Sequence, residues 1–361
     1  MPKGPGDFSG QLRECESAYQ DALDKLGLNK TTAVMRRFFL SDAANQEVAL
    51  SSSPLARRDP GDPVCISIVE QPPLPEGRVA LWAYHLSDPD GTLRKEQRDG
   101  GLLVPRASGS HLWTSELPGT EAMFRVDAGA QTRAAFESYQ EALRRHGARL
   151  RDHVIRTWIF VQSIDLDYGA MTRERRQLFE EEGMTPETHY IASTGIAGRR
   201  ADPRRTVILE GYAVPGIQAG QIRPLEAPAR LGPSHAYGVT FERGVRVDHG
   251  DRLHIFISGT ASIDNGGRVC HPRDIASQTE RTFENIAGLL DAAGSSFADL
   301  AQMIVYLRDP GDRASVASWL EERFPETPLL LVHAPVCRPE WLIEVECQAV
   351  APGGDPVWGR L

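Results

Sequence analysis

The sequence predicts an α+β protein made of repeated units, each a β-sheet covered by two helices. Two observations support this prediction. The last third of the chain alternates strand-like and helix-like segments, and the same alternation occurs again upstream. At 361 residues the chain is also longer than a usual single domain, so two or three units are expected.

The C-terminal unit, expected over residues 235–352, has the clearest pattern. Apolar residues alternate from His254 onward, and the alternation stops at the turn-forming Asn265-Gly266-Gly267. A helix is expected from Gln278, because apolar residues recur there at helical spacing, at Phe283, Ile286, Leu289 and Leu290. Short β-rich runs follow, so the expected order is strand, helix, strand, helix and two strands.

The ends of the helix at Gln278 carry recognisable signals. Asp274 or Ser277 can cap its start, because a short polar side chain accepts a hydrogen bond from the free amides of the first turn. Gly294 can end it by adopting a positive φ that other residues resist.

A second copy is expected over residues 101–215. Setting Gln278 against Gln131 gives an offset of 147 residues, and the strand-like runs VIRTWIFV and QMIVYLRD then follow equivalent helices. Residues 216–234, rich in proline and glycine, are interpreted as a linker. The offset also aligns Thr279 with Thr132, Phe283 with Phe136, Leu290 with Leu143 and Gly294 with Gly147.

A weaker third copy is expected over residues 1–100, as a divergent N-terminal unit. Setting Gly27 against Gly147 aligns Leu23 with Leu143, Tyr19 with Tyr139 and Arg36 with Arg156. The β-rich runs 63–69 and 79–85, joined by QPPLPEG, are predicted to form its closing hairpin.

Composition narrows the possible partners. Forty basic residues against 49 acidic ones give a net charge of −9, which disfavours nucleic acid. No apolar run is long enough to span a bilayer, and the first residues lack the apolar segment of a signal peptide, so a cytoplasmic protein without membrane contact is expected. Five cysteines without a C-x-x-C pair, and histidines without an H-x-x-H pattern, predict reduced thiols and no metal.

Several short motifs resemble those of the Rid/YjgF family. They are Ser258-Gly259, Gln278-Thr279, Asn285, Val305-Tyr306 and Ile343-Glu344-Val345-Glu346. This resemblance implies the chorismate mutase-like fold of that family, whose members form trimers with sites at subunit interfaces. Three linked units would then form a pseudo-trimer within one chain.

Glu344 and Glu346 lie two residues apart on a predicted strand, so both side chains point to the same face. Two like charges on one half-buried face are costly unless they have partners. Glu346 can belong to an exposed face, to a structural ion pair or to a site. For Glu344, the Rid resemblance implies a position in the interface pocket.

Arg308 ends a predicted strand, where an arginine can be solvated, paired with Asp309, or joined with Glu344 in a carboxylate clamp. Arg156 is the corresponding candidate in the middle unit. Simple Rid deaminases carry a carboxylate-binding arginine in a P-x-R segment, whereas this chain has Pro328-Leu329-Leu330. The hydrolysis of enamines and imines is therefore a less favoured reading.

A second set of segments extends over roughly residues 110–350. It includes Arg156-Thr157-Trp158, Thr194-Gly195-Ile196, Tyr237-Gly238, the strand 256–261 and the segment 331–338. These segments resemble those of the chorismatases. The resemblance implies cleavage of chorismate, a small carboxylate, without a cofactor, and the chain is expected to be a monomer or a homo-oligomer. Gly259 and Cys337 match the branch that makes 3-hydroxybenzoate, whereas alanine marks the branch that makes a dihydroxycyclohexadiene carboxylate.

The resemblance implies a set of site residues. Chorismate loses its enol-pyruvyl ether as pyruvate once the methylene carbon is protonated, so the site needs a proton donor and cations for two carboxylates. Glu344 would be the acid, its pKa raised by burial, and Cys337 would sit beside the ring unless it is a packed core thiol. The catalytic set is Glu344, Cys337 and Arg308, and the substrate-binding set is Arg156, Gly259, Tyr237, Thr194, Gly195 and Arg243.

Two alternatives stay open at this point. One is a Rid-like deaminase or hydrolase acting on an imine, an enamine or another small carboxylate. The other is a metabolite-binding protein without catalysis.

Overall fold

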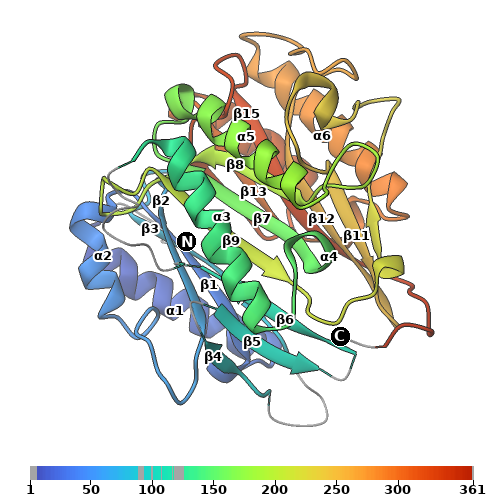
Figure 1. Ribbon diagram of the computed structural model, residues 1–361. Helices are drawn as coiled ribbons and strands as arrows, with labels where there is room; N and C mark the ends of the chain where they lie inside the picture. The colour runs from blue at the N-terminus through green and yellow to red at the C-terminus, as the bar shows by residue number, and fades with distance from the viewer. Residues whose placement is uncertain are drawn as a thin grey trace.

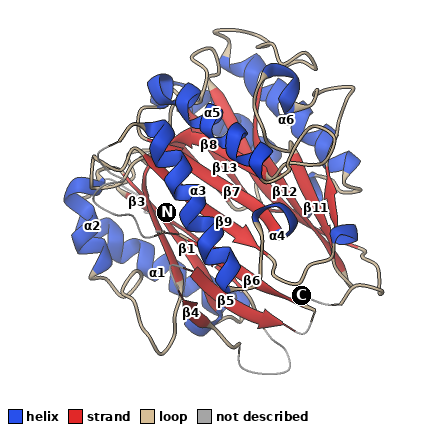
Figure 2. Cartoon of the chain, viewed as in Figure 1, coloured by secondary structure: helices blue, strands red, loops and turns tan. Residues whose placement is uncertain are grey.

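The computed structural model describes residues 6–87, 93–98, 101–106, 108–115, 117 and 126–359. Within these ranges the chain forms three β-sheets and seven α-helices. The strands gather in the interior and the helices lie on the outer faces (Figure 2). No helix of the described part combines the length and apolarity that crossing a membrane requires.

The N-terminal unit has a three-stranded sheet in the order β2-β1-β3, with β1 in the middle. Strand β1 pairs in parallel with β2 and antiparallel with β3. The predicted hairpin of the two later strands is therefore wrong. All eight residues of β1 are buried, so it is a central strand that needs a partner on both edges. The elements are α1 (Phe8–Leu26), β1 (Ala33–Leu40), α2 (Ala43–Ser51), β2 (Cys65–Glu70) and β3 (Val79–His85).

The middle unit has a six-stranded sheet in the order β4-β5-β6-β9-β7-β8. Its two long helices, α3 and α5, lie across the outer face of this sheet (Figure 1). The elements are β4 (Glu96–Arg98), β5 (Gly101–Arg106), β6 (Gly109–Thr114), α3 (Ala128–Arg145), α4 (Leu150–His153), β7 (Val154–Val161), α5 (Ile164–Glu181), β8 (Ala192–Ala197) and β9 (Val207–Ala213).

The C-terminal unit repeats this arrangement, with the strand order β10-β11-β12-β15-β13-β14. Its first helix begins at Ile275, three residues before the predicted start at Gln278, because Asp274, one of the two predicted caps, is the N-cap. Gly294 has a φ of +71° just after the helix, as predicted. The elements are β10 (Ile222–Pro224), β11 (Gly244–Asp248), β12 (Arg252–Ala261), α6 (Ile275–Ala292), β13 (Leu300–Leu307), α7 (Arg313–Arg323), β14 (Leu329–His333) and β15 (Ile343–Pro352). Short 3-10 turns are η1 (Lys30–Thr32), η3 (Ala219–Gln221), η4 (Ser234–Tyr237), η5 (Phe297–Asp299) and η6 (Pro310–Asp312).

The three units share one pairing rule. In each, the strand after the first helix pairs in parallel with the next strand and antiparallel with the last, as β1, β7 and β13 do. The largest buried apolar cluster draws residues from all three sheets, for example Met35, Trp158 and Val305. The prediction of an α+β fold with repeated units is thus confirmed.

The exact unit boundaries remain a proposal. The predicted boundary at residue 100 lies outside the described residues. The segment 216–234, interpreted as a linker, contains β10, which pairs antiparallel with β11.

Candidate active site

A cavity lies where the middle and C-terminal units meet. Strand β8 of the middle unit runs beside β12 of the C-terminal unit, since the Ser193 amide donates a 2.9 Å hydrogen bond to Ser258 Oγ. The lining residues come from α5, β8, β12, β15 and the segments before β11 and β15. They are Tyr168, Arg175, Ser193, Gly195, Tyr237, Val239, Phe241, Arg243, Gly259, Ala261, Ile263, Cys337, Arg338, Trp341 and Glu344.

The cavity is small as it stands. Its free volume of about 30 Å³ holds about two water molecules. A ring-sized ligand therefore requires lining side chains to move.

Glu344 provides the acid of this cavity. It lies on β15, opposite Tyr306 of β13, and only 4% of it is exposed. Burial raises the pKa of its carboxyl to about 8, the negative charge of Glu346 adds to this, and the nearby guanidinium groups oppose it. At neutral pH Glu344 is therefore mostly protonated and can donate a proton.

Gly259 makes room for that carboxyl. A Cβ atom at this position would lie 2.1 Å from Glu344 Oε1, a contact that no side chain could keep. Its amide donates a 3.0 Å hydrogen bond to Thr194 Oγ1, which ties β12 to β8.

Glu346 belongs to a structural ion pair, one of the alternatives left open by the sequence. Its carboxylate accepts hydrogen bonds of 2.8 Å from Arg156 Nη2 and 2.8 Å from Trp158 Nε1, and all three side chains are buried. Arg156 also donates to Thr194 Oγ1. Because Arg156 is paired with the Glu346 carboxylate of the C-terminal unit, it is not available to a ligand. Arg156 and Thr194 therefore lie behind the cavity wall.

Arg308 does not reach the cavity either, so the structure gives no support to a clamp with Glu344. Its guanidinium forms two hydrogen bonds to Asp165, of 3.1 Å from Nη1 to Oδ2 and 2.8 Å from Nη2 to Oδ1. Nη2 also donates to the carbonyl oxygen of Val336. The start of α5 brings Asp165 to the end of β13, and this carboxylate takes the place expected for Glu344 or Asp309.

Three other arginines supply the positive charge of the cavity. Arg175, on α5, is 2% exposed, and no hydrogen-bond partner for its Nε and Nη2 is found among the described residues. Arg243 donates to the Gly232 carbonyl and stacks on the Tyr237 ring. Arg338 lies over the rings of Tyr237 and Trp341. The cavity thus joins three cations to one neutral acid, which favours an anionic ligand.

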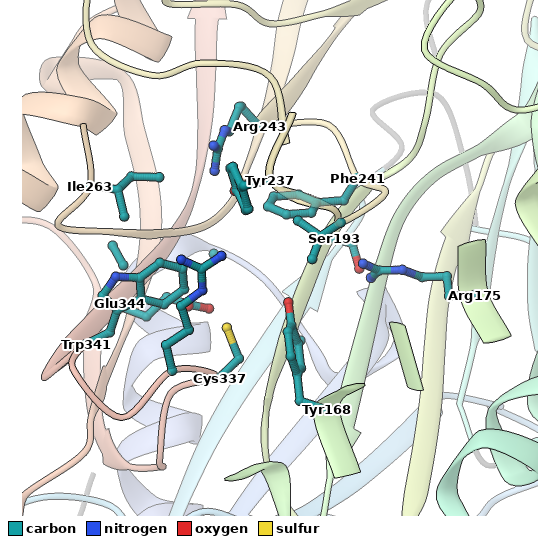
Figure 3. A pocket seen from close by; sticks show the side chains of 15 residues that line it. Tyr168, Arg175, Ser193, Tyr237, Phe241, Arg243, Ile263, Cys337, Trp341 and Glu344 are labelled. Atoms are coloured by element: carbon teal, nitrogen blue, oxygen red, sulfur yellow. The ribbon is translucent and has the colours of Figure 1, made fainter. Parts of the chain in front are cut away.

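Cys337 both packs and lines the cavity. It contacts two apolar clusters, and its sulfur points into the space between Glu344 and the Tyr168 hydroxyl (Figure 3). The Tyr168 hydroxyl faces the Cys337 sulfur across this space (Figure 3). Burial, and then the charge of Glu344, raise the pKa of the thiol to about 12, so Cys337 is a neutral thiol at pH 7 rather than a thiolate nucleophile.

The structure brings six of the nine predicted residues to one cavity: Glu344, Cys337, Gly259, Tyr237, Gly195 and Arg243. Four further lining residues were not predicted as site residues from the sequence: Tyr168, Arg175, Arg338 and Trp341. One signal was available on α5: Tyr168 and Arg175 are seven residues apart, so they share a helix face. An arginine on the face that also buries Met171 and Leu178 needs a polar reason to be there.

No metal site is evident in the part of the chain that the structure describes. Histidine, cysteine and carboxylate side chains form no group of three or more there that could hold an ion.

Comparisons with known proteins show which proteins this chain resembles. The family model described as Endoribonuclease L-PSP matches residues 241–351. A RutC family protein of Pyrococcus abyssi is 30% identical over 126 residues, which are 35% of this chain and 91% of that protein. A chorismatase of Streptomyces rapamycinicus is 26% identical over 275 residues, which are 67% of this chain and 78% of that protein.

A solved chorismatase structure resembles the whole architecture. It superposes with a TM-score of 0.67 at 21% identity, covering 88% of this chain and 93% of the chorismatase chain. This likeness shows that the two chains have the same fold. Together with the match to the archaeal relative, it confirms the family predicted from the motifs: the chain belongs to the RutC, or Rid/YjgF, family.

Proposed function

We propose that the protein is a chorismatase-like enzyme that converts chorismate into 3-hydroxybenzoate and pyruvate. The observation that carries this proposal is a buried glutamic acid, Glu344, in the lining of a cavity that it shares with three guanidinium groups. Burial raises the pKa of its carboxyl to about 8. The chorismatase relative, which matches across most of the chain, supports the same reading.

The charges of the cavity suit a ring with two carboxylates. Chorismate is a dianion, and the cavity offers Arg175, Arg243 and Arg338 against a Glu344 that is mostly neutral at pH 7. Arg175 is the best candidate for a direct carboxylate contact, because burying a guanidinium without a partner is costly unless a ligand supplies one.

The chemistry needs one proton at the right place. Glu344 donates its proton to the methylene carbon of the enol ether. The oxygen of the neighbouring ring hydroxyl then bonds to the ring carbon that carries the ether, the bond from that carbon to the ether oxygen breaks, pyruvate leaves, and the hydroxyl proton passes to the Glu344 carboxylate. The resulting epoxide takes up a proton on its oxygen and opens at the carbon that first carried the hydroxyl, and the other ring carbon loses its proton, which gives the 3-hydroxy group. The two products together contain the atoms of chorismate, so no water is consumed overall.

Cys337 and Gly259 support the aromatic product over the dihydroxycyclohexadiene carboxylate. A neutral thiol is a weakly polar group that holds a water molecule poorly beside the ring, and a site without ordered water favours the internal rearrangement. Gly259 allows the Glu344 carboxyl to stay against β12.

The direct test is an assay of the purified protein with chorismate over about pH 5 to 9, the range that brackets the titration of Glu344. We expect equal amounts of pyruvate and 3-hydroxybenzoate, measured by an enzyme-coupled assay and by chromatography. Release of neither product at any pH would refute the proposal, and pyruvate without the phenol would refute the product assignment.

The product assignment also predicts the effect of Gly259→Ala. The new Cβ atom would displace the Glu344 carboxyl, since the two positions lie 2.1 Å apart. We expect about ten-fold slower turnover, the scale of a misplaced catalytic group, and a larger share of the diene product. Chromatography of the products measures both, and an unchanged rate and product ratio would show that Glu344 is not held where we place it.

A further inference from the structure

We propose that the Asp165–Arg308 ion pair positions Cys337 for the reaction, a role that rests on the chorismatase-like function proposed above. The pair touches neither the cavity nor a ligand position, so Arg308 and Asp165 are positioning residues. They act through the peptide that precedes Cys337.

The pair holds one particular peptide group. The two terminal nitrogens of Arg308, Nη1 and Nη2, donate hydrogen bonds of 3.1 and 2.8 Å to Asp165. Nη2 also donates to the carbonyl oxygen of Val336. Val336 is fully buried and directly precedes Cys337. The direction of this carbonyl therefore sets where the next residue begins.

The other end of the linkage is the helix that carries Tyr168. Asp165 and Tyr168 are three residues apart on α5, so they lie on neighbouring parts of one helix surface. The Tyr168 hydroxyl faces the Cys337 sulfur inside the cavity (Figure 3). Of two adjacent residues, Val336 is thus linked to α5 through Arg308, and Cys337 faces the same helix at Tyr168.

Neighbouring contacts keep the segment folded without the pair. The Ala197 amide donates to the Pro335 carbonyl at 3.1 Å, and the Ala334 amide donates to the Leu307 carbonyl at 2.9 Å. On the other side, Arg338 Nη1 donates to the Gly267 carbonyl at 3.2 Å. Losing Arg308 should therefore shift the Val336 peptide and leave its flanks in place.

The ion pair contributes little to folding stability. Arg308 is 18% exposed and Asp165 is 47% exposed at the side chain, and ion pairs of this kind are weak in water. Arg308 nevertheless bridges two units, because the residues it joins lie 143 positions apart in the chain. An effect on the reaction that exceeds the effect on stability is therefore expected.

The test compares Asp165→Asn and Arg308→Lys with a matched control on the same helix, Glu181→Gln. Glu181 pairs with Arg133 at 3.0 Å and contacts no part of the Cys337 segment. We expect kcat for chorismate to fall about ten-fold in the first two variants, with KM changed less than about two-fold, because positioning is lost and binding is kept. The control should keep the wild-type kcat.

A double-mutant cycle with Cys337→Ala tests the route. If the pair acts through Cys337, adding Asp165→Asn to Cys337→Ala should cost little further activity. Two effects that multiply independently would overturn the proposal, as would a KM increase equal to the loss of kcat/KM.

A second readout does not depend on turnover. The rate of Cys337 alkylation by iodoacetamide, followed by mass spectrometry with the partly exposed Cys270 as reference, should rise at least about three-fold in Arg308→Lys, since a loosened segment exposes the thiol. An unchanged rate would overturn the positioning role. If the wild-type enzyme does not turn over chorismate, the proposed function fails, and the alkylation rates still decide whether the pair positions Cys337.

Discussion

Two junctions between units are built alike, and only one carries the candidate site. At the junction of the middle and N-terminal units, Arg37 of β1 donates to Glu210 of β9, at 2.6 Å from Nη2. At the junction of the C-terminal and middle units, Trp158 of β7 donates to Glu346 of β15 at 2.8 Å. Arg37 and Trp158 are equivalent, because each lies three residues before the last paired residue of its strand, β1 or β7. Glu210 and Glu346 are equivalent in the same way, because each lies three residues after the first paired residue of β9 or β15.

The same count shows where the junctions differ. Glu344 corresponds to Ile208, Gly195 to Ile68 and Ser193 to Ile66. All three isoleucines are buried. The repeated glutamate is thus structural, and the acid that occurs at one junction only lies in the cavity. Comparing the repeats within one chain therefore distinguishes the structural Glu346 from Glu344 in the cavity. Their positions on one face of the same strand do not distinguish them.

The largest expected effect comes from removing the acid that distinguishes the junction with the cavity from the other junction. Glu344→Gln should lower kcat for chorismate by about 10²- to 10⁴-fold, because the proton donor is lost while the shape is kept. Steady-state kinetics with folding checked by circular dichroism measures it. Full activity in a folded variant would show that another group provides the proton.

At the junction of the middle and N-terminal units, a substitution should lower the folding stability and leave the rate of the reaction unchanged. Glu210→Gln should lower the free energy of unfolding by about 3 kcal/mol, because it leaves the Arg37 guanidinium buried without its counter-charge. Denaturant unfolding measures this, and the kcat of the folded variant should match the wild type. A loss of kcat at unchanged stability would mean that this junction takes part in the chemistry.

Substitutions at Gly195 test whether the isoleucine at the equivalent position, Ile68, is what leaves no cavity at the junction of the middle and N-terminal units. A Cβ atom at 195 would meet Met171 at 3.4 Å and Tyr168 at 3.6 Å, which are ordinary contacts. Gly195→Ala should therefore change KM by less than about two-fold, whereas Gly195→Ile should raise it about ten-fold by filling the cavity. Equal effects of the two variants would show that bulk at this position does not control access.

The sequence allows the fold to be predicted because repeated motifs mark local elements. The offset from Gln131 to Gln278 and the cap at Asp274 depend on residues close together in the chain. The error in the N-terminal unit arose where pairing is not local. Strands β2 and β3 are neighbours in sequence, yet each pairs with β1, since the burial of that strand demands two partners.

The site was predicted mainly through residues that belong to a motif. Glu344, Gly259 and Cys337 lie in such segments, and all three line the cavity. Arg308 was given the wrong partner because Asp165, 143 residues away, reaches it only through the packing of two units. Arg175 was missed for the same reason, since which face of α5 meets the C-terminal unit is a property of the assembled chain.

The last prediction concerns pH and stability, and it separates Glu344 from Ile208, its counterpart in the middle unit. The pKa of Glu344 rises from 4.5 in the unfolded chain to about 8 in the fold, so the folded state binds more protons between these values. This contribution to stability is complete below about pH 4.5 and is lost as the pH rises through about 8. Wild-type stability should therefore fall from pH 5 to pH 9 relative to Glu344→Gln, which cannot titrate there.

Thermal unfolding of both proteins across this range measures the difference, with Glu181→Gln as the control on an exposed carboxylate. The difference in melting temperature between the wild type and Glu344→Gln should change steadily between about pH 5 and pH 8 and level off above about pH 8, while the control stays parallel to the wild type. The rate should follow the same group, with kcat/KM falling as the pH rises through about 8. Parallel curves for wild type and Glu344→Gln would mean that Glu344 is already ionised in the fold, and an ionised Glu344 could not be the acid that the cleavage of the enol ether requires.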